Sequence, residues 1–204
     1  CPTVHQPTTA MTKDEISELV EKFIKAAVRL KNAGIDGVEV HGAHGYLIHE
    51  FLSPRANKRT DEYGGSLENR MRFLKEIVQG IKNICGEDFP VTVRLSVDEF
   101  DVHGIDVQES KKISSYLEKI GVDGLHASAG NYNSFDKIIE SPLFEQGWRV
   151  YLAEAIKQEV QIPEGLNHWD MTFGFKERFC LTDLIFENGM YIATGYYQEG
   201  TPPI

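Results

Sequence analysis

Two histidines and a tyrosine follow a short apolar stretch of this sequence. His41, His44 and Tyr46 belong to the run GVEVHGAHGYLIHEF, in which alternating valines give way to polar side chains. A polar group buried without a partner costs about 1–3 kcal/mol, so this cluster is a poor core and favours a reaction site. Imidazole N–H groups donate hydrogen bonds, and a phenol can deliver a proton as a general acid. We expect His41 and His44 to polarise one carbonyl oxygen and Tyr46 to supply the acid.

An arginine in a second apolar stretch needs a negative partner. Arg94 lies in VTVRLS, and a guanidinium keeps its charge at all ordinary pH values. When buried, it must therefore pair with an anion or with carbonyl oxygens. One interpretation pairs Arg94 with Glu39 on the neighbouring strand. The other has Arg94 donate to an electron-rich ring or a phosphate and stabilise negative charge that develops during a reaction.

A metal site is the competing use of the same region. His41, His44, His49 and Glu50 offer imidazole and carboxylate ligands, and a metal hydrolase built on His41, His44 and Glu50 is one alternative function. The HExxH pattern is not completed after His49-Glu50, and the sequence predicts no helix there that aligns ligands four residues apart. The sequence therefore predicts no metal. His126, on a later strand, is expected to point inward.

Helices and strands alternate along the chain at the interval of parallel βα units. Thr12 and Glu15 form a capping box for a helix that ends near Asn32, and Ser66 and Asp106 can each cap a further helix. The predicted strands are residues 37–41, 91–96 and 124–127, and the last helix covers residues 151–158. Apolar residues at helical spacing give the second helix a buried stripe of Phe73, Leu74, Ile77, Val78, Ile81 and Ile84.

This arrangement predicts an α/β fold that forms part of a TIM (β/α)8 barrel, with about three central βα units. In the first strand, Val38 and Val40 alternate with Glu39 and His41, and VTVRLS alternates in the same way. In such a barrel the aliphatic face meets the helices, and the polar face, with Glu39, His41 and Arg94, looks inward. The carboxyl ends of the strands hold the chemistry.

The composition describes a globular chain with few classes of partner. The chain has 204 residues, 41% of them hydrophobic, and a formal net charge of −10. The charge argues against nucleic-acid binding, which depends on clustered lysines and arginines. No apolar run reaches the roughly 18 residues that span a bilayer, so no membrane segment is expected. Three cysteines without CxxC spacing favour a reducing cytoplasm over a disulfide or metal framework.

One long motif resembles a known family. The run over residues 37–70, GVEVHGAHGYLIHEFLSPRANKRTDEYGGSLENR, together with VTVRLS, resembles the old yellow enzyme family of NAD(P)H:flavin oxidoreductases, and weaker agreement covers residues 9–163. The resemblance implies FMN, which takes hydride from NADH or NADPH and passes it to the activated C=C bond of an α,β-unsaturated carbonyl compound. It also implies that His41 and His44 grip the carbonyl oxygen, that Tyr46 protonates the α-carbon, and that Arg94 lies beside flavin N1 and the C2 carbonyl.

The resemblance ends at Pro163, which predicts a partial barrel over residues 1–163 and an unassigned tail over residues 164–204. Alternation in the tail favours short antiparallel strands with a turn at Asn188-Gly189. A barrel segment with few strands exposes strand edges, so we expect a homo-oligomer or association with a complementary barrel fragment. The alternative to the enzyme is therefore a catalytically inactive segment that acts only through such association.

Overall fold

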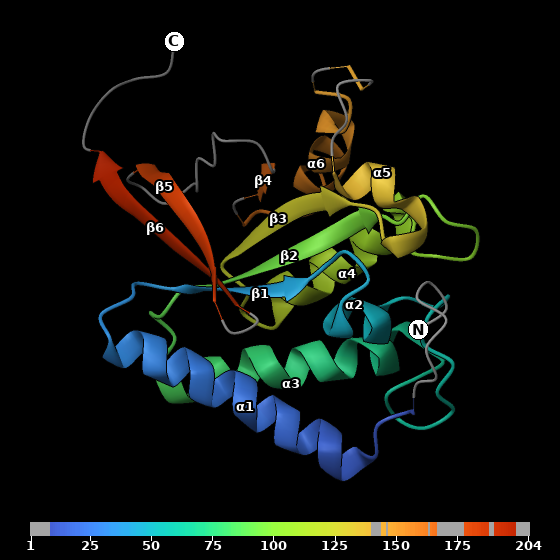
Figure 1. The fold of residues 1–204 in the computed structure, drawn as a ribbon, viewed down its shortest axis with the longest axis horizontal. Coiled ribbons are helices and arrows are strands. Elements are labelled where there is room, and N and C mark those ends of the chain that lie inside the picture. The colour runs from blue at the N-terminus through green and yellow to red at the C-terminus, as the bar shows by residue number, and fades with distance from the viewer. Residues whose placement is uncertain are drawn as a thin grey trace.

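A computed structural model describes most of the chain (Figure 1). It describes residues 9–139, 144–145 and 147–162, and the backbone of residues 164–166, 178–187 and 190–198. The helices are α1 (Lys13–Asn32), α2 (Leu47–Leu52), α3 (Leu67–Cys85), α4 (Val107–Lys119), the 3₁₀ turn η1 (Tyr132–Ser134), α5 (Phe135–Ile138) and α6 (Val150–Lys157). The strands are β1 (Val38–Gly42), β2 (Val91–Asp98), β3 (Gly124–Ala129), β4 (Glu164–Leu166), β5 (Arg178–Glu187) and β6 (Met190–Gln198). Within the described residues, a helix long and apolar enough to cross a membrane is not found.

The three predicted helix starts are confirmed. Thr12 Oγ1 accepts a hydrogen bond from the Glu15 backbone N–H at 3.2 Å, and the Glu15 carboxylate accepts from the Thr12 backbone N–H at 2.7 Å. Ser66 caps α3 and Asp106 caps α4, and each side chain accepts the backbone N–H three residues further along. These caps satisfy N–H groups that have no partner within the first helical turn.

Strands β1 to β4 form one parallel sheet in chain order. The register places His41 of β1 opposite Arg94 of β2, and Arg94 opposite His126 of β3. All three predicted strands are present, and β2 and β3 extend beyond their predicted ends to Asp98 and Ala129. The sequence does not predict β4, because three residues are too few for a recognisable period. Its strand character comes from its pairing with β3.

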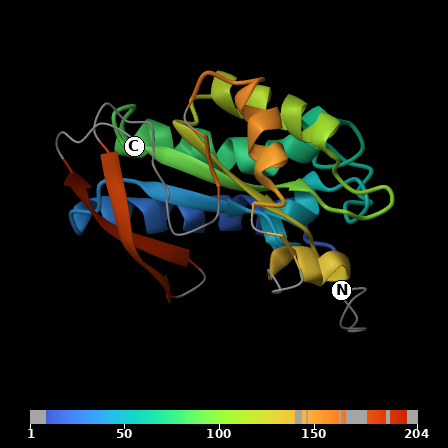
Figure 2. The same ribbon diagram turned by 90° about the horizontal axis from the view of Figure 1, so that it is seen from above.

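The aliphatic face of the sheet packs against helices, as predicted. Val40, Val93 and Leu125 belong to one buried core with the apolar faces of α1, α3 and α4. Figures 1 and 2 show α1 and α3 packed side by side along this face of the sheet. The predicted stripe of α3 is wrong at one position: Ile84 is 64% exposed, whereas Cys85 is buried. At about 100° per residue, Ile84 lies about 80° and Cys85 about 20° from the centre of the face that the nine buried residues of α3 form.

Helix α2 corrects the prediction that no helix surrounds His49. Its buried residues Ile48, Phe51 and Leu52 stand at the i, i+3, i+4 spacing of a helix face, so the signal was present in the sequence. Three apolar residues next to His49 and Glu50 are too few for this helical spacing to be recognised from the sequence. Because α2 begins directly after Tyr46, which stands at its N-cap position, the helix fixes where the Tyr46 backbone lies.

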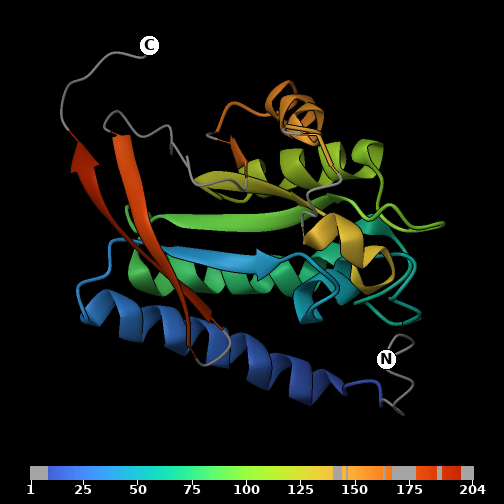
Figure 3. The ribbon, with the colours of Figure 1, turned by 45° about the horizontal axis from the view of Figure 1, so that its top comes forward.

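The tail is β-rich, as predicted: β5 and β6 pair as a separate antiparallel sheet. Figure 3 shows this pair at the amino-terminal ends of β1 and β2, whereas α2 and α5 lie at the opposite, carboxyl ends. The predicted turn at Asn188-Gly189 lies outside the described residues. The division of the chain into residues 1–163 and 164–204 stays a prediction.

Candidate active site at the carboxyl ends of the strands

The structure brings the three predicted reaction residues together. His41 ends the inward face of β1, and the centre of its ring lies 5.1 Å from that of His44 and 5.3 Å from that of Tyr46. Half of the Tyr46 surface is exposed, whereas His44 is buried. These three side chains form one wall, in which the two imidazoles are the inner part and the phenol of Tyr46 is the exposed part.

Two serines on neighbouring strands hold His44. The His44 backbone N–H donates to Ser96 Oγ at 3.0 Å, and His44 Nε2 lies 2.6 Å from Ser128 Oγ. His44 also has a φ of 64°, a left-handed conformation that is uncommon outside glycine and that clusters at functional sites. The sequence places Ser96 on the polar face of its strand, but Ser128 comes from β3, and its part in the site depends on a contact 84 residues away.

Both histidines of the wall are neutral at neutral pH. Burial lowers the pKa of His41 to about 4, and the nearby Arg94 guanidinium adds to this effect. The same two causes lower the pKa of His44 to about 2. A neutral imidazole carries one N–H, so each ring can donate one hydrogen bond to a ligand oxygen without delivering a proton. An acid for proton transfer must therefore come from another group, and Tyr46 is adjacent.

These lowered pKa values predict that the fold loses stability as the pH falls from 6.5 to 5. In that range unfolded histidines take up protons at their ordinary pKa of 6.5, whereas folded His41 and His44 resist protonation, so acid favours the unfolded chain. We expect a loss of roughly 1–3 kcal/mol relative to a His41→Gln/His44→Gln double variant, measured by urea unfolding at both pH values. If the free energy of unfolding fell equally in the two proteins between pH 6.5 and pH 5, the lowered pKa values of His41 and His44 would be contradicted.

A row of charged and polar side chains crosses the inward face of the sheet, and it begins at His41 of this wall. His41, Arg94 and His126 occupy paired positions on β1, β2 and β3. Glu39 Oε2 lies 3.1 Å from His126 Nδ1, which confirms that His126 points inward. Burial raises the pKa of Glu39, but His126 and Arg94 outweigh it and lower the pKa below its usual value. Arg94 therefore helps to stabilise the Glu39 carboxylate, as one interpretation of the sequence expects, and this carboxylate also accepts a hydrogen bond from His126 Nδ1.

Tyr132, which the sequence does not single out, forms the outer side of the site. Its ring meets that of Tyr46 edge-on, with 5.7 Å between ring centres. Burial and the neighbouring Tyr46 hydroxyl raise the pKa of Tyr132 to about 12, so it stays protonated. A Cβ atom at Gly45 would lie 2.8 Å from the Tyr132 ring, and Gly45 has a φ of 76°. Only glycine fits between these two tyrosines.

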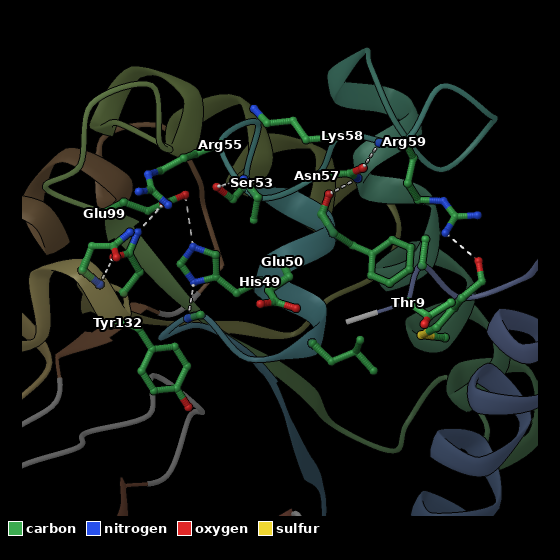
Figure 4. Close-up of a pocket in the computed structure, with 18 residues that line it drawn as sticks. Thr9, His49, Glu50, Ser53, Arg55, Asn57, Lys58, Arg59, Glu99 and Tyr132 are labelled. Carbon is green, nitrogen blue, oxygen red and sulfur yellow. Dashed lines mark hydrogen bonds and ion pairs between the residues drawn. The ribbon is translucent and has the colours of Figure 1, made fainter. Parts of the chain in front are cut away.

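A cavity of about 700 Å³ lies behind this turn (Figure 4). It is bounded by residues 9–11, by α2, by the loop that follows α2 and by η1. Figure 4 shows His49 and Tyr132 on one side of it and Arg59 and Thr9 on the other. His49, Glu50 and Arg55 line this cavity and not the wall of His41, His44 and Tyr46. Groups of three or more side chains suited to a metal ion are not found among the described residues.

Comparison with known proteins gives the family. The sequence pattern of the NADH:flavin oxidoreductase / NADH oxidase family matches residues 3–163. An NADH oxidase of Thermoanaerobacter brockii is 55% identical over 153 residues, which are 75% of this chain and 24% of that protein. An NADPH dehydrogenase of Halalkalibacterium halodurans is 44% identical over 157 residues, 76% of this chain and 44% of that protein.

A solved structure supports the same assignment. The old yellow enzyme homologue from Zymomonas mobilis superposes with a TM-score of 0.63 at 31% identity, over 82% of this chain and 46% of that one. This chain therefore belongs to the NADH:flavin oxidoreductase / NADH oxidase family, and it is an α/β segment of a TIM barrel, as predicted. The family uses FMN, with NADH or NADPH as reductant. The chain spans less than half the length of these three relatives.

Proposed function

We propose that this chain carries the substrate-activating half of an FMN-dependent oxidoreductase. In this proposal, hydride passes from NADH or NADPH through the flavin to the activated C=C bond of an α,β-unsaturated carbonyl compound. The observation that carries it is that the rings of His44 and the half-exposed Tyr46 each lie about 5 Å from the ring of His41, which is paired across the sheet with the buried Arg94. Two donors and one acid are the groups that a polarised carbonyl and its α-carbon need.

The inward face of the sheet fits the edge of a flavin ring. His126 Nε2 is buried without a hydrogen-bond partner among the described residues, and it lies in the same row as the buried Arg94 guanidinium. Because Nδ1–H donates to the Glu39 carboxylate, Nε2 of the neutral ring is an acceptor; a buried acceptor without a partner is costly, and the N3–H at the edge of a flavin ring would satisfy it. Arg94 would hold FMN on the side where negative charge accumulates when the ring is reduced.

FMN, when bound, supplies the hydride for the β-carbon of the alkene. Side chains of this protein polarise the carbonyl group and supply the proton. His41 and His44 each donate one N–H hydrogen bond to the substrate carbonyl oxygen, which draws electron density from the double bond. Tyr46 O–H then gives its proton to the α-carbon, and the phenolate that remains recovers a proton from water at the exposed side. Ser96 and Ser128 keep His44 in place throughout.

FMN binding tests this proposal directly. Titration of FMN with the purified chain should quench flavin fluorescence, and NADH or NADPH should then bleach the absorbance of the bound flavin under anaerobic conditions. Arg94→Met should weaken FMN binding by about tenfold or more, because it removes a charged hydrogen-bond donor. Substitution of Lys22, an exposed residue that pairs with Glu18 on α1, provides the control. A chain that gives no change with excess FMN would contradict the proposal.

A second candidate is a non-catalytic role through association. β1 and β4 are the outer strands of the parallel sheet, and parallel sheets are rarely left with open edges. In this reading, a second copy of the chain or a complementary barrel segment pairs with these edges. Light scattering combined with size exclusion distinguishes the candidates: a stable monomer that binds FMN supports the enzyme alone, and a dimer that does not bind FMN supports association alone.

A further inference from the structure

We propose that His49 is a positioning residue that holds the turn between His44 and Tyr46, and that Glu99 keeps its imidazole in the tautomer this task requires. The inference rests on the proposed function, because it assigns a part in the same site. His49 does not touch the substrate wall. It lies on α2 beneath the turn, almost fully buried.

The contacts of His49 define its protonation. The Gly45 backbone N–H donates to His49 Nδ1 at 3.1 Å, so Nδ1 carries no proton. His49 Nε2 lies 3.1 Å from Glu99 Oε1, so the Nε2 proton faces the carboxylate (Figure 4). The imidazole is thus neutral, with one nitrogen that accepts and one that donates.

Glu99 ties this imidazole to the loops that follow β2 and β3. Its carboxylate accepts hydrogen bonds from the Ile105 backbone N–H at 2.9 Å and from Asn131 Nδ2 at 2.6 Å. Burial opposes ionisation of Glu99, but its contacts with His49, Ser53 and Ile105 outweigh this effect and hold the pKa of its carboxyl below its usual value. One buried carboxylate therefore links three segments: α2, which follows β1, and the loops that follow β2 and β3. These are the three strands that carry the site.

The turn that His49 holds is short and conformationally demanding. Gly45 stands between His44 and Tyr46, and both His44 and Gly45 have left-handed backbones. Such backbones persist only where surrounding contacts enforce them. The hydrogen bond from Gly45 N–H to His49 is the contact that reaches the centre of this turn from α2. Loss of it would leave His44 held by its serines and Tyr46 held at the start of α2, but would release the Gly45 backbone that links them and sets the angle between their side chains.

Two substitutions separate the two nitrogens of His49. Asparagine places its Oδ1 near the position of Nδ1, so His49→Asn keeps an acceptor for the Gly45 N–H and loses the donor for Glu99. Glutamine places its Nε2 near the imidazole Nε2, so His49→Gln keeps a donor for Glu99 and loses the acceptor for Gly45. Both variants have similar polarity and remove the same ring, so each is the control for the other.

Amide hydrogen exchange of the chain itself is the first test. The Gly45 amide should exchange about tenfold faster or more in His49→Gln than in the unaltered chain, and should stay protected in His49→Asn. Equal midpoints of urea unfolding would show that the two variants are equally folded. Equal exchange rates at Gly45 in both variants would overturn the proposal, because the Glu99 contact or the bulk of the ring would then be what matters.

The two half-reactions of the FMN-loaded protein are the second test. His49→Gln should slow reoxidation of the reduced flavin by 2-cyclohexen-1-one about tenfold relative to His49→Asn, and the two variants should be reduced by NADPH at similar rates. Equal slowing of both half-reactions in both variants would overturn the proposal. If the unaltered protein is not reduced by NADPH at all, the proposed function fails, whereas the exchange experiment still decides whether His49 holds the turn.

Discussion

Replacing Tyr46 by phenylalanine will slow the reduction of an α,β-unsaturated ketone by about 10²–10⁴-fold, the range that one positioned general acid contributes. The phenol is the acid nearest to the two carbonyl donors, and its ring centre lies 5.3 Å from that of His41. His41 and His44 cannot replace it, because their pKa values of about 4 and 2 leave them neutral at neutral pH, and the N–H of a neutral imidazole is too weak an acid to protonate carbon. Stopped-flow reoxidation of the reduced, FMN-loaded protein measures this step.

The reductive half-reaction and Tyr132→Phe are the controls for that variant. Reduction of the flavin by NADPH needs no proton from Tyr46, so its rate should stay within about twofold of the unaltered protein. Tyr132 packs edge-on against Tyr46 and its hydroxyl contacts that of Tyr46, so Tyr132→Phe should slow reoxidation far less than Tyr46→Phe, which removes the acid itself. A Tyr46→Phe protein that reduces the ketone at full speed would show that the acid is elsewhere.

Replacing Phe73 by alanine will destabilise the fold by about 3–5 kcal/mol, the usual cost of truncating a buried aromatic residue. Phe73 is completely buried, and its ring lies 4.6 Å from that of Phe51 and 6.2 Å from that of Phe23. It therefore joins α3 to both α2 and α1. Urea unfolding followed by circular dichroism measures the loss, and α2 should become the least protected helix in hydrogen exchange.

Ile84→Ala on the same helix is the matched control. Ile84 is 64% exposed, so its truncation leaves no cavity and should change the free energy of unfolding by no more than about 0.5 kcal/mol. This pair also tests the correction to the predicted stripe of α3. A loss of similar size for Ile84→Ala and Phe73→Ala would mean that the predicted stripe, and not the observed burial, is right.

The sequence is sufficient for those parts of the fold that depend on local pattern. Helix starts at Thr12, Ser66 and Asp106 follow from side chains that cap the backbone three residues away, and β1 and β2 follow from alternating apolar residues. The meeting of His41, His44 and Tyr46 is also local, because a strand end and one turn bring them together. These features need no knowledge of how distant segments pack.

The parts that the sequence misses depend on contacts between distant segments. Ser128 reaches His44 across 84 residues and Glu39 reaches His126 across 87, and neither pair has a spacing that marks it. Glu99 looks like one more acidic residue in a loop, yet it is buried among donors from α2 and from the loops that follow β2 and β3. β4 is likewise defined by its partner strand. Burial and pairing of this kind arise only when the sheet has formed.

The order of the sheet has a consequence for how the protein is made. β1, β2, β3 and β4 lie side by side in the order in which they are synthesised. When β2, β3 or β4 leaves the ribosome, the preceding strand with which it pairs has therefore already emerged. His41 leaves the ribosome first, Arg94 comes to lie beside it when β2 pairs with β1, and His126 completes the row when β3 pairs with β2. Within this described sheet, each later strand adds beside the previous one and does not insert between earlier strands. The polar row can therefore assemble during translation, one strand at a time, as the chain emerges.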